Sequence, residues 1–205
     1  MNAKGDHQLR LWNKTDPITH TVSMRLESLF ESALDSLNIR TKTAVHDCST
    51  GLSLTYSQLH SFSHHLAFQL SRCMIDPNTG ISHINRFVML YLDTGIHISV
   101  GYLGILKAGH AIVPVKPGTP IDRIRYMIDD ANISLIITQT KFTSKLQRSM
   151  SQGLITKIPV LDIEKHLDLS FSEIDLASSN KSDLDPVYCI YTSGSTGLPV
   201  IFLVS

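Results

Sequence analysis

The stretch Phe87-Val88-Met89-Leu90-Tyr91-Leu92 is an apolar run with the length of a single buried strand. Residues 94–108 follow it with a helix-like pattern, and Gly109 stands where such a helix would end. Residues 111–115 form a second short apolar run. A strand, a helix and a strand in this order predict one β–α–β unit, whose two strands lie parallel in the same sheet.

The same alternation continues toward the C-terminus. Thr119 is predicted to be the N-cap of a helix in which Pro120 is the first residue. Apolar strands that alternate with helices predict an α/β fold, with a mostly parallel, doubly wound sheet covered by helices. The further predicted elements are a helix with Ile121, Ile124 and Ile128 turned inward, a strand at 135–138, a helix at 141–150, a strand at 158–161 and, after a serine-rich acidic linker at 170–182, a last strand at 187–191.

Before residue 87 the sequence predicts two helices and a hairpin. Apolar residues recur at helical spacing over 22–37, and two short runs at 44–46 and 53–54 flank a Thr-Gly turn. Thr55 is predicted to cap the second helix, with Gln58 completing a capping box. The residues predicted to form the buried stripe of that helix are Leu59, Phe62, Leu66 and Leu70, and a loop is predicted at 76–85.

A loop rich in hydroxyl groups and glycine follows the last predicted strand. It is part of the string Tyr188-Cys189-Ile190-Tyr191-Thr192-Ser193-Gly194-Ser195-Thr196-Gly197-Leu198-Pro199. Glycine lets the backbone approach a phosphate group closely, and N–H and hydroxyl groups can bind it. Ligands of open α/β sheets bind at the carboxyl ends of the strands, where this loop stands. The chain contains neither the Walker pattern nor Gly-x-Gly-x-x-Gly, and a solvated Ser/Gly turn is the alternative interpretation of the loop.

Residues 191–199 resemble the phosphate-loop signature of adenylate-forming enzymes, the AMP-dependent synthetase and ligase superfamily. Residues 54–59 are similar to the Leu-Thr-Tyr-x-Glu-Leu motif of that family. Residues 104–115 resemble its second core motif, in the Leu-Lys-Ala-Gly-x-Ala-x-Val-Pro form of amino-acid adenylation domains of nonribosomal peptide synthetases. Lys116 stands where the family usually has Asp, which we interpret as a tolerated surface change. The resemblance extends over residues 12–199.

This resemblance implies the N-terminal part of the large lobe of an adenylation domain, truncated after the phosphate loop. Such enzymes activate an amino acid or another carboxylic acid with ATP and Mg²⁺, and then pass it to a phosphopantetheine carrier protein or to coenzyme A. Carrier-protein and condensation domains are the implied partners, while the acid that is activated and the product stay undetermined. The residues implied to hold the β- and γ-phosphates are Thr192, Ser193, Gly194, Ser195, Thr196 and Gly197.

The resemblance stops after Pro199, where the signature continues with Lys-Gly and this chain continues with Val200-Ile201. The predicted organisation is a linker-like segment at 1–14, a partial adenylation domain at 15–199 and a non-matching tail at 200–205. No residue matches the catalytic lysine of the family, and we assign no catalytic residue and no metal ligand, so the chain is expected to be inactive alone. The alternatives are a fragment of an acyl-CoA ligase or adenylating reductase, and a non-catalytic nucleotide-binding module.

Composition excludes several other classes of protein. The 205 residues carry 18 basic and 18 acidic side chains, so no net charge favours binding to nucleic acid or to an anionic membrane. No apolar stretch is long enough for a membrane span, and a cytoplasmic location is predicted. Neighbouring His64 and His65 are interpreted as helix-surface residues, because adjacent helical side chains diverge too far to share a metal ion. The predicted state of Cys48, Cys73 and Cys189 is buried and free.

Overall fold

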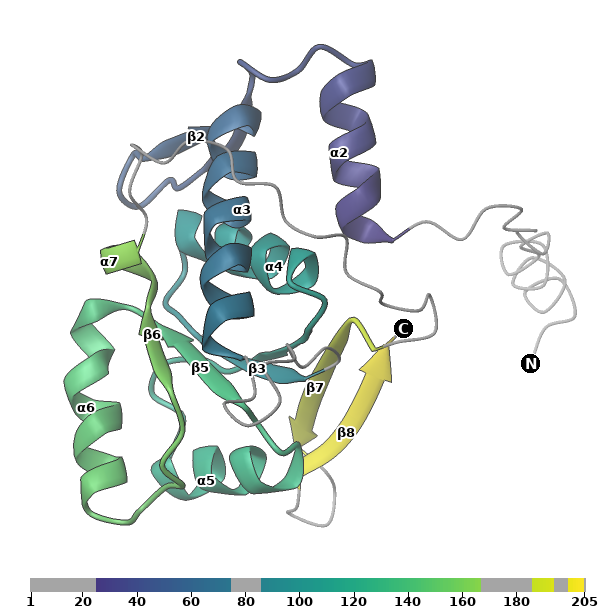
Figure 1. The fold of residues 1–205 in the computed structure, drawn as a ribbon. Coiled ribbons are helices and arrows are strands. Elements are labelled where there is room, and N and C mark those ends of the chain that lie inside the picture. Colours follow the sequence, from purple (N-terminus) through teal and green to yellow (C-terminus); the bar gives the residue numbers. More distant parts are fainter. Residues whose placement is uncertain (1–24, 75–85, 167–185, 194–198, 205) are drawn as a thin grey trace, which may run out of the picture.

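The computed structural model describes residues 25–74, 86–166, 186–193 and 199–204. Within these residues the centre of the fold is a six-stranded sheet with the strand order β6-β5-β3-β4-β7-β8 (Figure 1). Five strands are parallel, which confirms the α/β fold predicted from the alternating pattern. The parallel strands are β3 (Phe87–Tyr91), β4 (Ala111–Pro114), β5 (Leu135–Thr138), β6 (Val160–Asp162) and β7 (Tyr188–Ser193), and β8 (Pro199–Val204) is antiparallel to β7.

Strand β3 lies in the middle of the sheet and pairs on both sides. Phe87 is in register with Ala111 of β4, and Val88 is in register with Leu135 of β5. Chain order and sheet order therefore diverge at β3: the chain first moves to β4 on one side and then crosses back to β5 and β6 on the other. A reversal of this kind is the switch point at which doubly wound sheets bind ligands.

Helices cover both faces of the sheet (Figure 1). Side chains alternate along β3, so Val88 and Leu90 enter the hydrophobic cluster on one face while Met89 and Tyr91 enter the other; all four are at most 3% exposed. Strands of a parallel sheet are buried on both faces, as predicted for this apolar run. The first face is covered by α3 (Tyr56–Cys73) and α4 (Ile96–Lys107), and the second by α5 (Ile121–Asp130) and α6 (Thr140–Ser151).

The N-terminal elements match the predictions closely. Strands β1 (Thr43–His46) and β2 (Ser53–Thr55) form the expected antiparallel hairpin. The Thr55 hydroxyl accepts from the backbone N–H of Gln58 at 3.2 Å, and the Gln58 side chain accepts from the N–H of Thr55 at 2.9 Å, which confirms the capping box. All four residues of the predicted α3 stripe are buried. The helix predicted over 22–37 is α2 (Leu26–Ser36), and residues 22–24 and the predicted loop and linker at 76–85 and 170–182 lie outside the described residues.

The predicted start of α5 was wrong by one residue. Pro120 is the N-cap, with extended backbone angles, and Ile121 is the first helical residue. The Thr119 hydroxyl donates to the carbonyl of Lys116 at 2.7 Å, so it closes the preceding turn and does not cap the helix. Thr can bond its own neighbouring backbone in a turn, and here that local bond is made in place of the cap.

Two predictions about burial were also wrong. His65 is only 7% exposed, although it was expected on the surface of α3. Helix α3 packs against α2 and the β1–β2 hairpin as well as against α4, so more than one of its faces is covered. All three cysteines are free thiols, but only Cys189 is buried. Cys48 lies in the turn of the hairpin and Cys73 is the last residue of α3, and both positions are exposed.

Helices α3 and α4 pack closely at Gly104. A Cβ atom placed on Gly104 would lie 2.7 Å from Cδ2 of Leu66 and 2.9 Å from its Cβ and Cγ atoms. Only glycine permits this approach, since neither side chain nor backbone of a packed core can move far without loss of other contacts. The small residue therefore sets the distance between the two helices that cover one face of the sheet.

We expect Gly104→Ala to destabilise the protein by about 1–3 kcal/mol, in spite of the better helix propensity of alanine, because it overpacks the α3–α4 contact. Urea unfolding followed by circular dichroism measures the change. The same substitution in a Leu66→Ala background should cost clearly less, since the contacts with Cδ2 and Cγ are removed and only the Cβ atom at 2.9 Å remains. Equal effects in the two backgrounds would show that the contact is not the cause.

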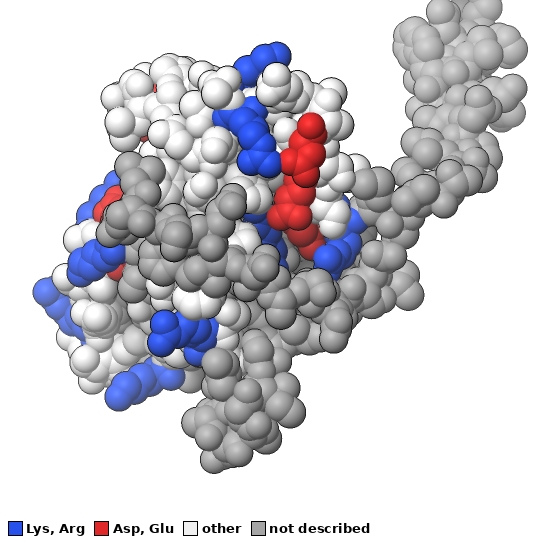
Figure 2. Space-filling view, turned by 45° about the horizontal axis from the view of Figure 1, so that its top comes forward, with Lys and Arg blue, Asp and Glu red and all other residues white. Residues whose placement is uncertain are grey.

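A buried ammonium group joins α2, α3 and α4. The side chain of Lys107 is 3% exposed, and its Nζ atom lies 3.4 Å from Oε1 of Glu31, 3.2 Å from Nδ1 of His60 and 5.6 Å from the ring centre of Phe30. Burial lowers the pKa of Lys107, while Glu31 opposes this shift. Figure 2 shows acidic side chains in a row beside basic ones on this side of the molecule. Glu31, whose side chain is 48% exposed, thus connects α2 to α4 through an ion pair in which only the lysine is buried.

The stability of the protein should fall as the pH drops below 6.5. Burial, and then the charge of Lys107, lower the pKa of His60 from its ordinary value of 6.5, so the folded state resists a proton that the unfolded chain accepts. The contribution of His60 to the free energy of unfolding is therefore fully present above pH 6.5 and is lost as the pH falls below that value. Melting temperatures measured from about pH 7.5 to about pH 5.5 should show this slope, and His60→Gln should flatten it.

The control for loss of an imidazole is His46→Gln, on the exposed side of the hairpin. A slope that is as steep in His60→Gln as in the unsubstituted protein would assign the pH dependence to other groups, such as His97, whose pKa burial also lowers.

Candidate functional site

The switch point at the carboxyl edge of the sheet is closed by a side-chain network. Gln139, directly after β5, accepts from the backbone N–H of Asp93 beyond β3 at 2.8 Å and donates to Oε1 of Glu164 beyond β6 at 3.0 Å. The backbone N–H of Thr140 donates to Oε2 of Glu164 at 3.1 Å, and Lys141 pairs with the Asp93 carboxylate at 2.8 Å. The polar groups that a ligand would need between β3 and β5 are thus bonded to one another.

The electrostatics of this network favour charged carboxylates. Burial of Glu164 would raise its pKa, but hydrogen bonds from Thr140 and Gln139 outweigh this effect and the pKa is lowered. The pKa of Asp93 is lowered by its hydrogen bond with Lys141 and by the N–H of Thr94. Both groups therefore remain acceptors near neutral pH and hold the three strand ends together.

The second candidate position at this edge is the end of β7. The strand runs two residues further than predicted, so Thr192 and Ser193 are strand residues at its carboxyl end. Ser193 is in register with Pro199 of β8, which runs antiparallel to β7. The remaining predicted phosphate-binding residues, Gly194, Ser195, Thr196 and Gly197, lie outside the described residues. The structure thus brings Thr192 and Ser193 to the predicted edge and does not test the role of the six residues.

Strand β7 is attached to α5 by a contact that the sequence analysis missed. The hydroxyl of Tyr191 donates to Oδ2 of Asp130 at 2.8 Å, and its ring meets the ring of Tyr126 edge to face at 6.3 Å. Burial, with a further effect of Asp130, raises the pKa of Tyr191, so this hydroxyl stays protonated and remains a donor. The sequence did contain one indication of this contact. Cys189 and Tyr191 are two residues apart in a strand, so both side chains lie on the same face, which is the face covered by α5.

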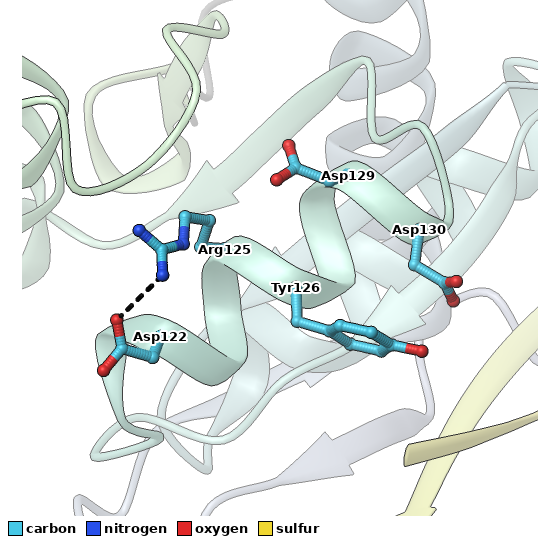
Figure 3. A pocket seen from close by; sticks show the side chains of 5 residues that line it. All are labelled: Asp122, Arg125, Tyr126, Asp129 and Asp130. Carbon is cyan, nitrogen blue, oxygen red and sulfur yellow. Dashed lines mark ion pairs between the residues drawn. The ribbon is translucent and has the colours of Figure 1, made fainter. Parts of the chain in front are cut away.

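An open hollow of about 550 Å³ lies along α5 beside this contact (Figure 3). Its charged groups are three aspartates and one arginine, and Arg125 is paired with Asp122 at 3.4 Å. An excess of carboxylates repels a triphosphate, so the hollow is not suited to hold the phosphates of a nucleotide. The residues that line it are Asp122, Arg125, Tyr126, Asp129 and Asp130.

Comparison with known proteins decides the family. The family model described as AMP-binding enzyme matches residues 38–199. This chain belongs to the AMP-binding enzyme family. The match ends at Pro199, the residue after which the signature is interrupted, and it contains α3, α4 and all five parallel strands.

The curated relatives include several peptide synthetases. Tyrocidine synthase 3 from Brevibacillus parabrevis is 33% identical over 183 residues, which are 89% of this chain and 3% of that protein. Bacitracin synthase 2 from Bacillus licheniformis is 32% identical over 174 residues, or 85% of this chain and 6% of that protein. The chain therefore spans only a few per cent of the length of these relatives.

Solved structures of the family share the fold. The nonribosomal peptide synthetase FmoA3 in its AMPPNP-bound form superposes with a TM-score of 0.72 and 20% identity over 100% of this chain and 19% of its own. A fatty acyl CoA synthetase from Mycobacterium tuberculosis superposes with a TM-score of 0.63 and 19% identity, over 80% of this chain and 31% of its own. At these identities the comparison establishes the architecture of the adenylate-forming N-terminal lobe and does not separate amino acids from fatty acids as substrates.

The described part of the chain lacks the features of two other classes of site. Among those residues, no helix combines the length and the apolar character that crossing a membrane requires. The same residues contain no group of three or more His, Cys, Asp or Glu side chains placed to hold a metal ion.

We expect Gln139→Ala to destabilise the protein by about 1–3 kcal/mol, because it leaves the Asp93 N–H and the Glu164 carboxylate without their partner. Urea unfolding gives the free energy. Gln147→Ala, at an exposed position of α6, is the matched control and should change the free energy of unfolding by less than about 0.5 kcal/mol. Equal effects of the two substitutions would mean that the network contributes little.

Proposed function

We propose that the chain is the N-terminal part of an adenylation domain that activates an amino acid with ATP in nonribosomal peptide synthesis. The observation that carries this proposal is a sequence identity of more than 30% with peptide synthetases over most of the chain. In this chain the Ser/Gly loop directly follows β7. A fragment of an acyl-CoA ligase is the second candidate, because the fatty acyl CoA synthetase has the same fold. The peptide synthetases among the curated relatives, at 33% and 32% identity, support the first, while the superposed structures, at 20% and 19% identity, do not separate the two.

The phosphate groups of ATP would be bound by the hydroxyl and N–H groups of residues 192–197. Thr192 and Ser193 stand at the carboxyl end of a parallel strand, whereas the Gln139 network lies beyond β3, β5 and β6. Such donors bind an anion without an acid–base role, and they stabilise pyrophosphate as its charge develops. ATP supplies the adenylyl group when it is bound.

Magnesium and the partners of the reaction are further parts of this proposal. The described residues near the end of β7 provide no group of carboxylates for Mg²⁺, so the ion would be bound by ATP and by residues beyond those described. The FmoA3 neighbour was solved with AMPPNP, and another neighbour, McyG, as a complex of A and PCP domains with phenylalanyl-adenylate. By analogy we propose ATP, an amino acid, a carrier protein and a condensation domain as partners, in the cytoplasm.

Nucleotide binding tests the role of the loop. Titration calorimetry of the chain with Mg·ATP should give a Kd tighter than about 1 mM. Ser195→Ala and Thr196→Val should each weaken binding about 2- to 12-fold, as expected for loss of one hydrogen bond of about 0.5–1.5 kcal/mol. Ser151→Ala, at the exposed end of α6, is the control and should leave the Kd unchanged. Binding no tighter than millimolar, or loop variants that behave like the control, would contradict this assignment.

Activity of the chain alone is expected to be absent. Residues 1–205 contain no position that matches the catalytic lysine of the family, so amino-acid-dependent exchange of pyrophosphate into ATP should not exceed the blank. A clear exchange signal that Ser195→Ala abolishes would overturn this expectation.

A further inference from the structure

We propose that Asp130 is a positioning residue, which acts through Tyr191 to fix the carboxyl half of β7 and thereby the backbone of Thr192 and Ser193. The effect on ATP rests on the proposed function, whereas the attachment of the strand does not. The hydrogen bond of 2.8 Å between the Tyr191 hydroxyl and the Asp130 carboxylate is the contact through which it acts.

The carboxyl half of β7 needs such a contact because its neighbour in the parallel sheet ends early. In the described structure β4 and β7 are in register at one pair, Ile112 with Tyr188, next to the hydrogen bond from Ile112 to Val187. Strand β4 ends at Pro114, which has no N–H group to donate to a ladder. Beyond Cys189 the register of the described residues pairs the backbone of β7 with β8 alone, and β8 belongs to the same hairpin.

Side chains on one face of β7 replace the missing ladder. Cys189 is 1% exposed and packs in the cluster beneath α5, and Tyr191 contacts Tyr126 and Asp130 at the end of that helix. On the opposite face Ile190 is 37% exposed. The strand is thus held from the α5 side at Tyr191, the residue directly before the first predicted phosphate-binding residue, Thr192.

The three aspartates of α5 have different partners, which makes the assignment to Asp130 specific. Asp122 pairs with Arg125, and Asp129 accepts from the hydroxyl of Thr156 at 2.8 Å. Asp130 accepts from Tyr191, and Figure 3 shows it and Tyr126 projecting from α5 on the side of the strands drawn in yellow. Substitution of Asp129 therefore removes the same charge from the same hollow without touching β7.

Amide hydrogen exchange tests the attachment directly. In Asp130→Ala and in Tyr191→Phe, the amides of Thr192 and Ser193 should exchange at least about 10-fold faster, while the amides of β3 and β5 keep their rates. Asp130→Asn, which retains an acceptor oxygen, should restore part of the protection, and Asp129→Ala should resemble the unsubstituted protein. Unchanged exchange at both amides, or an equal increase throughout the sheet, would overturn the proposal; Tyr191→Phe decides it if Asp130→Ala does not fold.

Calorimetry with Mg·ATP tests the link to the nucleotide. Asp130→Ala should weaken the Kd about 3- to 10-fold and Asp129→Ala should not, although both lose a carboxylate. A Kd that is the same in all variants, together with faster local exchange, would overturn the link to binding and leave the attachment. If the unsubstituted protein binds no ATP, the proposed function fails, and hydrogen exchange still decides the role of Asp130.

Discussion

The structure depends on one constraint, which is that a parallel sheet must be covered on both of its faces. Strand β3 shows this most clearly, because its consecutive side chains enter two separate hydrophobic clusters and none of Val88 to Tyr91 is more than 3% exposed. Strands β3, β4 and β5 are therefore each followed by a helix that covers one face or the other. Two contacts serve this constraint. Gly104 allows α4 to lie close to α3 over one face of the sheet, and the ion pair of Lys107 with Glu31 connects α2 to α4.

The parts of the fold that follow from local patterns could be predicted from the sequence, and the parts that depend on distant partners could not. Apolar runs gave β3, β4 and β5 nearly to the residue, and the capping box of α3 needs only Thr55 and Gln58. The burial of His65 depends on helices and strands that pack around α3, which no local pattern shows. The prediction for the cap of α5 failed for another reason: the Thr119 hydroxyl donates to the carbonyl of Lys116 in the preceding turn, and Pro120 is the N-cap.

The candidate site also has parts that the sequence predicts and parts that depend on residues far apart in the chain. The structure places Thr192 and Ser193 at the carboxyl end of β7, where the strand pattern predicts them. The general rule that ligands bind at this edge does not distinguish the end of β7 from the switch point beside β3. That distinction comes from Gln139, whose bonds to Asp93 and Glu164 join residues far apart in the chain. The contact of Tyr191 with Asp130 is of the same kind, and its two residues belong to elements that the sequence presents as unrelated.

The position of β7 beside β4 has a consequence for the order in which the lobe is completed during synthesis. Strands β3, β4, β5 and β6 can pair through short connections, but β7 reaches the free side of β4 only after all of them have been made. Contacts between distant parts of a chain form slowly, because a long loop must close before they contribute any free energy. Until then the edge of β4 presents unpaired backbone groups to other nascent chains. The sheet therefore keeps an open edge during synthesis until residues 188–193 have been made and pair with β4.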